Sequence, residues 1–192
     1  AKCLGDVAMN DLRDVLKALS DRGFCLSRLA SKHNVLDTLR ILRPLVSSYE
    51  LLRIGGHHDG GYLVPLDLEG IQACFSPGVG SKANFEVELR SNFGITSYLA
   101  DASVDSPPPE AADMEFEKKF LGSRLDNNFL SLDEWVNSKA NGLDNGDFLM
   151  QMDIEGGELD VLIHASEDTL NRFRIILIEI HNLESLLVES TR

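Results

Sequence analysis

The sequence contains few cysteines, and their spacing argues against both structural disulfide bonds and structural metal sites. Cys3, Cys25 and Cys74 are scattered along the chain, too few and too far apart for a disulfide framework. No Cys-x-x-Cys spacing is present, which argues against structural zinc. The sequence also lacks an apolar run of membrane-spanning length and an amino-terminal signal-peptide pattern. We therefore expect a cytoplasmic protein with reduced thiols.

Basic residues are scarce as well. The chain has 18 lysine and arginine residues against 31 aspartate and glutamate residues, a formal net charge of −13. Nucleic acid and anionic membranes are disfavoured as partners, because binding to either requires a basic surface. A length of 192 residues, of which 43% are hydrophobic, fits one soluble globular domain with its own core.

Helical periodicity comes first along the chain, and strands alternating with helices follow it. Residues 1–52 predict a helical region, with apolar side chains at helical spacing in residues 12–19 and 35–42. Residues 53–192 are expected to form the main part of a single domain. Its expected strands are residues 73–76, 96–101, 116–121, 148–153 and 175–181. Ser131 and Glu134 form a capping-box pattern at the start of one helix. The alternation predicts an open, mostly parallel α/β sheet on which the amino-terminal helices pack.

A glycine turn ends the first expected strand. Gly78 and Gly80 lie between that strand and a helix, where glycine lets a ligand approach the backbone and free amides attract an anion. Asp101 ends the next strand, where a carboxylate can accept hydrogen bonds from ribose hydroxyls. A plain turn explains the glycines equally well, and Ala83 also completes the spacing of a nicotinamide-cofactor fingerprint.

Acidic residues follow the fourth and fifth strands. Asp153 and Glu155 are expected on one side if the fourth strand continues that far, and Glu179 and His181 on one face of the fifth. Such groups can orient a cationic group, bind a hard metal ion or act as a base. Glu158 is interpreted as a helix-capping residue. A hydrogen-bonded structural role is as plausible for His181 as proton transfer.

Four glycines in residues 53–62 predict an unusual backbone or one that is closely approached by a ligand. Asp59 and Tyr62 are the candidate substrate-binding residues of this segment, since glycines beside Asp59 let the loop fold over a ligand. Adjacent histidines rarely point to one ion, so His57 and His58 are interpreted as surface or substrate-loop residues.

The run from Met152 to Leu162, followed by Ile178-Glu179-Ile180-His181, resembles the FkbM-type methyltransferases, in which Asp-x-Glu-Gly-x-Glu precedes a Glu-x-His strand end. Residues 53–62 and the Phe75-to-Gly80 turn are similar to one branch of that family, and the resemblance covers roughly residues 53–187. It implies a class I methyltransferase (Rossmann-like) fold, S-adenosylmethionine as donor and transfer to a hydroxyl oxygen.

Two departures from the family pattern stand out. The turn lacks the acid that many members have before the first glycine, and the chain stops soon after the fifth strand. The final antiparallel hairpin of the family fold is therefore expected to be missing.

The resemblance also suggests how the cofactor is bound. The amides near Gly78 to Gly80 and of the following helix would meet the methionine carboxylate of the cofactor, Asp101 would hold the ribose, and Asp153 would also bind the cofactor. Proton removal from the acceptor is assigned to His181 or Asp153, with His181 ranked slightly ahead.

The acceptor is expected to be a small molecule or sugar that bears a hydroxyl group. Asp59, Tyr62, Glu155 and Glu179 would enclose it. No metal ligand is assigned, although a divalent metal on the carboxylates would serve the same chemistry. Two rivals stay open, an NAD(P)-dependent oxidoreductase or epimerase and a non-catalytic nucleoside-binding module.

Overall fold

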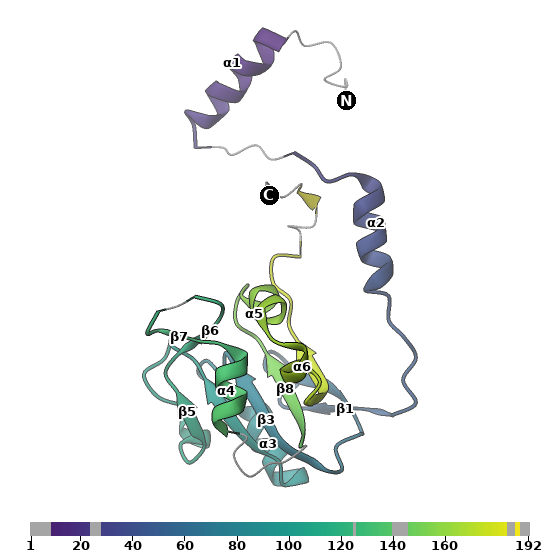
Figure 1. Ribbon diagram of the computed structural model, residues 1–192, viewed down its shortest axis with the longest axis vertical. Coiled ribbons are helices and arrows are strands. Elements are labelled where there is room, and N and C mark those ends of the chain that lie inside the picture. The colour runs from purple at the N-terminus through teal and green to yellow at the C-terminus, as the bar shows by residue number, and fades with distance from the viewer. Residues whose placement is uncertain (1–8, 24–27, 125, 140–145, 184–186, 189–192) are drawn as a thin grey trace. The chain divides into compact units, whose positions relative to one another are not determined.

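A computed structural model describes residues 9–23, 28–124, 126–139, 146–183 and 187–188 of the chain (Figure 1). The chain divides into two compact units, one of residues 46–182 and the other of residues 1–45 together with 183–192. The smaller unit contains α1 (Met9–Ser20) and α2 (Lys32–Ile41), which confirms both predicted helices. Ser31 caps α2 by accepting a hydrogen bond from the Asn34 amide at 3.1 Å. The expected packing of residues 1–52 on the sheet stays a prediction.

A five-stranded parallel sheet forms the centre of the larger unit, in the order β5-β4-β3-β8-β9. The strands are β3 (Ile71–Pro77), β4 (Thr96–Ala100), β5 (Glu115–Glu117), β8 (Asp147–Met152) and β9 (Phe173–Ile178). They confirm the predicted open α/β fold. The third expected strand, residues 116–121, is divided between β5 and β6 (Phe120–Leu121), and the fifth ends at Ile178 rather than at residue 181.

Two small sheets were not predicted. β1 (Leu51–Ile54) pairs antiparallel with β2 (Tyr62–Pro65), and β6 pairs in parallel with β7 (Phe129–Leu130). The glycine-rich segment is therefore the connection of a hairpin. Gly55, at φ +89°, lies so close to Gly60 that a Cβ would be 2.3 Å from the Gly60 carbonyl oxygen. These strands are too short to give an alternating pattern in the sequence.

The helices of the larger unit are short. They are α3 (Asn84–Phe93), α4 (Leu132–Lys139), α5 (Glu158–His164) and α6 (Glu167–Leu170), with a 3₁₀ turn at Pro109–Ala111. The predicted capping box is confirmed at α4, where the Ser131 hydroxyl accepts from the Glu134 amide and Glu134 accepts from the Ser131 amide. None of the helices in the described ranges is both long and apolar enough to cross a bilayer.

Apolar side chains cover both faces of the sheet. On one face Phe75, Phe148 and Met150 pack with Trp135 of α4 and Val161 of α5. The other face packs against α3 and the β1–β2 hairpin, through the buried side chains Cys74, Leu149, Ile175, Phe85, Leu89, Ile54 and Val64. The larger unit is thus built in three layers (Figure 1).

The strand order reverses at β3, which lies between β4 and β8. In open parallel sheets, ligands bind beyond the carboxyl ends of the strands at such a switch point. The Asp153 amide donates to the Pro77 carbonyl at 3.2 Å and so joins the ends of β8 and β3. The topology therefore brings the Gly78–Gly80 turn after β3 next to Asp153 after β8.

Candidate functional site

A cavity of about 800 Å³ opens at the carboxyl ends of β3, β4 and β8. This volume is within the range of small-molecule sites. The sequence-predicted site residues that line it are Asp59, Tyr62, Gly78, Gly80, Asp101, Asp153 and Glu155. Glu179 and His181 are not among the described residues that line it. The fold thus gathers most of the predicted residues around one space.

Gly78 permits the closest approach between two strand ends. Its backbone has φ +86°, and a Cβ there would lie 1.6 Å from the carbonyl oxygen of Asp153. At Gly80, with φ +56°, a Cβ would meet no atom of the described residues within 4 Å beyond the two chain neighbours. Close packing therefore requires glycine only at position 78, whereas at position 80 the backbone conformation alone favours glycine.

Asp101 is tied to the glycine turn. Its two carboxylate oxygens accept hydrogen bonds from the Gly80 amide at 2.9 Å and the Ser103 amide at 2.7 Å. The Gly78 amide donates to the Ala100 carbonyl at 2.8 Å. The Gly78 and Gly80 amides thus have acceptors within the protein, and the expected contact of a methionine carboxylate with the amides of this segment and of the following helix stays a prediction. Each Asp101 oxygen keeps a second lone pair for a ribose hydroxyl.

Asp153 has one carboxylate oxygen engaged and one without a hydrogen bond. The Tyr62 hydroxyl donates to Oδ2 at 3.1 Å, whereas Oδ1 is buried and has no hydrogen-bond partner among the described residues. Burial raises the pKa of Asp153, and burial together with Asp153 raises the pKa of Tyr62. A cavity-lining carboxylate with a raised pKa and an available oxygen is suited to accept a proton.

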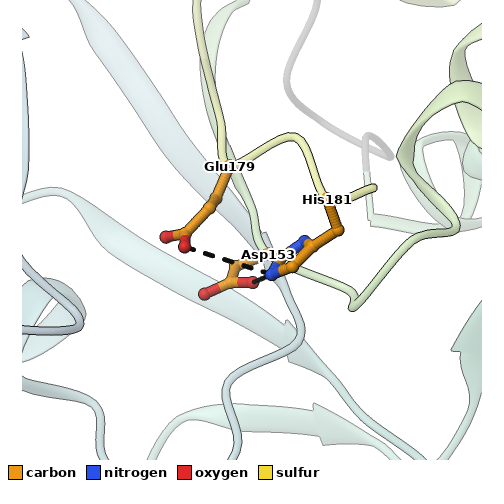
Figure 2. Close-up of side chains that lie close together, drawn as sticks. All are labelled: Asp153, Glu179 and His181. Carbon is orange, nitrogen blue, oxygen red and sulfur yellow. Dashed lines mark ion pairs between the residues drawn. The ribbon is translucent and has the colours of Figure 1, made fainter. Parts of the chain in front are cut away.

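His181 faces a group of carboxylates just after β9 (Figure 2). Its Nε2 is 3.6 Å from Asp153 Oδ1, 3.5 Å from Glu155 Oε2 and 4.0 Å from Glu179 Oε1. The expected juxtaposition is present, but strand alternation does not produce it. β8 ends at Met152, Glu155 turns at φ +56°, and β9 ends before Glu179.

Glu158, which the sequence indicated as a helix-capping residue, also contacts the His181 ring. Its side chain is only 2% exposed, and its Oε1 lies 2.9 Å from His181 Nδ1 and accepts from the Gly156 amide at 2.9 Å. This hydrogen bond is the largest cause of the raised pKa of His181, with Glu155 contributing next. The interpretation of Glu158 as a helix-capping residue is therefore incomplete, because the side chain also fixes the His181 ring.

Replacing Glu158 should change the titration of His181. We expect the pKa of His181 to fall toward its ordinary value of 6.5 in Glu158→Gln, since the strongest partner of the imidazolium is lost. An NMR pH titration of the His181 ring measures this. The control Glu155→Gln removes an 86% exposed carboxylate and should lower the pKa less. Equal effects in the two variants would contradict the role given to Glu158.

Asp153, Glu179 and His181 could also hold a metal ion. Each offers one ligand atom, and the three atoms lie within 4.8 Å of one another. Carboxylate oxygen and imidazole nitrogen are common ligands of divalent metals, and a carboxylate on the far ring nitrogen often orients such a histidine. Glu158 occupies that position on Nδ1.

A second wall of the cavity was missed in the sequence. It is formed around β6 and β7 by Lys119, Phe120, Ser123, Arg124 and Phe129. The Arg124 guanidinium lies 5.0 Å from the centre of the Phe129 ring, and Asp160 of α5 accepts from the Ser123 amide and hydroxyl. This wall was not predicted because residues 116–121 were expected to form one strand, whereas the turn between β5 and β6 falls within that stretch.

Comparison with known proteins supplies the family. No curated protein and no solved structure matches the chain. The family model described as the methyltransferase FkbM domain matches residues 58–189. The match covers well over half of the chain and includes the cavity together with Glu179 and His181. The chain therefore belongs to the FkbM family of methyltransferases, as its sequence motifs predicted.

Proposed function

We propose that this methyltransferase moves a methyl group from S-adenosylmethionine to a hydroxyl oxygen of a small molecule or sugar. One observation carries the proposal: a single cavity is lined both by the Gly78–Gly80 turn with Asp101 and by the available carboxylate of Asp153. A nucleoside site and a proton acceptor thus share one space.

The turn end of the cavity suits the donor. Asp101 is 6% exposed and lines the cavity, so its remaining lone pairs can accept from the two ribose hydroxyls. The absence of a side chain at Gly78 lets the ends of β3 and β8 approach closely, which brings the glycine turn and Asp153 to the same cavity. When bound, S-adenosylmethionine supplies a methyl group already activated by a positively charged sulfur.

The acidic end of the cavity suits the acceptor. Transfer forms an oxygen–methyl bond, breaks the sulfur–methyl bond and releases the hydroxyl proton, which the Asp153 carboxylate accepts. We prefer Asp153 to His181 as the base, because the hydrogen bond to Glu158 and the neighbouring carboxylates raise the pKa of His181 and so favour its protonated form. Asp153 also lines the cavity, whereas His181 lies next to it and balances its charge.

The groups around Asp153 fit an acceptor with several hydroxyls. Asp59 and Glu155 offer carboxylate oxygens to the cavity, and Phe120 and Phe129 of the β6–β7 wall offer ring surfaces to the same space. Carboxylates accept from hydroxyl groups, and aromatic rings pack on the apolar faces of sugars and related molecules.

Ligand titration tests the donor assignment. We expect wild-type protein to bind S-adenosylhomocysteine and not NAD, and Asp101→Asn to bind S-adenosylhomocysteine about tenfold more weakly, since hydrogen bonds to a charged group are worth about 1.5 kcal/mol or more. Isothermal titration calorimetry measures these three protein–ligand interactions. Binding of NAD in place of S-adenosylhomocysteine would support the oxidoreductase alternative. Binding of S-adenosylhomocysteine without methyl transfer to any hydroxylated acceptor would support a non-catalytic module.

A further inference from the structure

Three buried polar side chains lie together beneath the cavity, and the proposed reaction gives none of them a role. Ser76 of β3 is 0% exposed, Glu86 of α3 is 3% exposed and Gln151 of β8 is 5% exposed. Glu86 and Gln151 also line the cavity. Burial of three polar groups next to a ligand site is costly unless their hydrogen bonds are satisfied.

With the oxygen of the Gln151 amide, rather than its nitrogen, facing Ser76, the number of available hydrogens fixes how these groups are paired. The Ser76 hydroxyl contacts two oxygens, Glu86 Oε1 at short distance and Gln151 Oε1 at 2.8 Å. A hydroxyl has a single hydrogen and can donate to only one of them. Both contacts are satisfied when Glu86 is protonated and donates to Ser76, which in turn donates to Gln151.

The surroundings of Glu86 favour this neutral form. Burial raises the pKa of Glu86, and the carboxylate of Glu110 raises it further, against an opposing hydrogen bond from Ser76. No ion pair to Glu86 occurs among the residues of the described ranges. An ionised carboxylate at this depth, without a cation, would be strongly disfavoured.

The arrangement leaves the Gln151 amide nitrogen as a donor. Its oxygen accepts from Ser76, and within the described part of the chain its nitrogen has no acceptor, although the side chain lines the cavity. Ser76 and Glu86 belong to β3 and α3, the two elements on either side of the Gly78–Gly80 turn. The donor therefore lies at the turn end of the cavity, the end proposed for the cofactor.

We propose that Ser76 and Glu86 hold the Gln151 side chain so that its amide N–H donates to an acceptor atom of the bound nucleoside cofactor. This inference rests on the proposed function. Gln151 would contact the ligand, whereas Ser76 and Glu86 would be positioning residues that act through it.

A double-mutant cycle on S-adenosylhomocysteine affinity tests this arrangement. Gln151→Leu should weaken binding by roughly three- to tenfold, the value of one hydrogen bond. Ser76→Ala should weaken it by a similar factor although Ser76 does not line the cavity. The double variant should bind no more weakly than Gln151→Leu alone, because Ser76 acts only through Gln151. Ser97→Ala, which removes another fully buried serine hydroxyl on β4, is the matched control and should bind like wild type.

The possible outcomes separate the two proposals. If wild-type protein does not bind S-adenosylhomocysteine, the proposed function fails and this inference fails with it. If wild type binds and the Gln151 and Ser76 variants keep its affinity, or their losses add, this inference alone is overturned.

Infrared spectroscopy of wild-type protein gives a second test that does not depend on those variants folding. At neutral pH we expect the carbonyl band of a protonated carboxylic acid, and we expect Glu86→Gln, a neutral side chain of the same shape, to lack it. Absence of the band from wild type, or its persistence in Glu86→Gln, would overturn the proposed proton arrangement.

Discussion

Asp153→Asn is expected to lower kcat by about a thousandfold, a typical contribution of a positioned general base. The substitution preserves the size of the side chain and can keep a hydrogen bond with Tyr62, so the fold should survive. It removes the negative charge of the carboxylate, and with it the ability to accept the acceptor's proton and the charge pairing with His181. Steady-state kinetics and calorimetry with S-adenosylhomocysteine measure the two effects, and affinity should change little.

Two comparisons make this result specific to Asp153. Glu155→Gln alters a neighbouring carboxylate that is 86% exposed and should reduce kcat far less. In wild type, kcat should rise with pH as Asp153 ionises, with a midpoint above the ordinary carboxyl value of 3.8, because burial raises its pKa. Wild-type turnover in Asp153→Asn would exclude this residue as the base and return the role to another group of the site.

Gly78→Ala is expected to be the most destabilising single substitution in the cavity, with a loss of about 4 kcal/mol or more in the free energy of unfolding. A methyl group would lie 1.6 Å from the Asp153 carbonyl oxygen, and the backbone at φ +86° disfavours any side chain. The ends of β3 and β8 would have to separate, so cofactor binding should be lost as well.

Gly80→Ala is the matched control for Gly78→Ala. Its backbone is also left-handed, at φ +56°, but the added methyl group would have open space around it in the described part of the chain. Only the conformational penalty remains, about 1–2 kcal/mol. Urea unfolding of both variants measures the difference. Equal losses would show that the close contact between the two strand ends contributes nothing beyond backbone strain.

Local patterns predicted the central sheet well. Apolar runs such as Phe148–Met152 show a strand directly, and the residue after the run, Asp153, then falls at the carboxyl end of the sheet. Parallel topology makes such ends neighbours, which is why Gly78, Asp101 and Asp153 could be assigned to one site before their contacts were known.

Contacts between distant parts of the chain could not be predicted in this way. Tyr62 and Asp153 are 91 positions apart, and Glu158 and His181 are 23 apart. Nothing in the spacing of Glu158 distinguishes a capping residue from a partner of a histidine. The β1–β2 hairpin was hidden because glycines occupy its connection and each strand has only four residues.

The unusual feature of the site is its concentration of acids around one histidine. His181 lies within 4.0 Å of Asp153, Glu155, Glu158 and Glu179 in a chain whose net charge is already −13. Mutual repulsion would separate these carboxylates unless a cation lay among them. The raised pKa of His181 favours its protonated form, which places a positive charge next to Asp153, for which no arginine or lysine of the described ranges provides an ion pair.

A crystal structure of the complex with S-adenosylhomocysteine would show where the cofactor lies in the cavity. We predict that the ribose lies on Asp101, above Gly78, and that the sulfur faces Asp153 across the cavity. Adenosine bound outside the ends of β3, β4 and β8, or sulfur directed away from Asp153, would contradict the account.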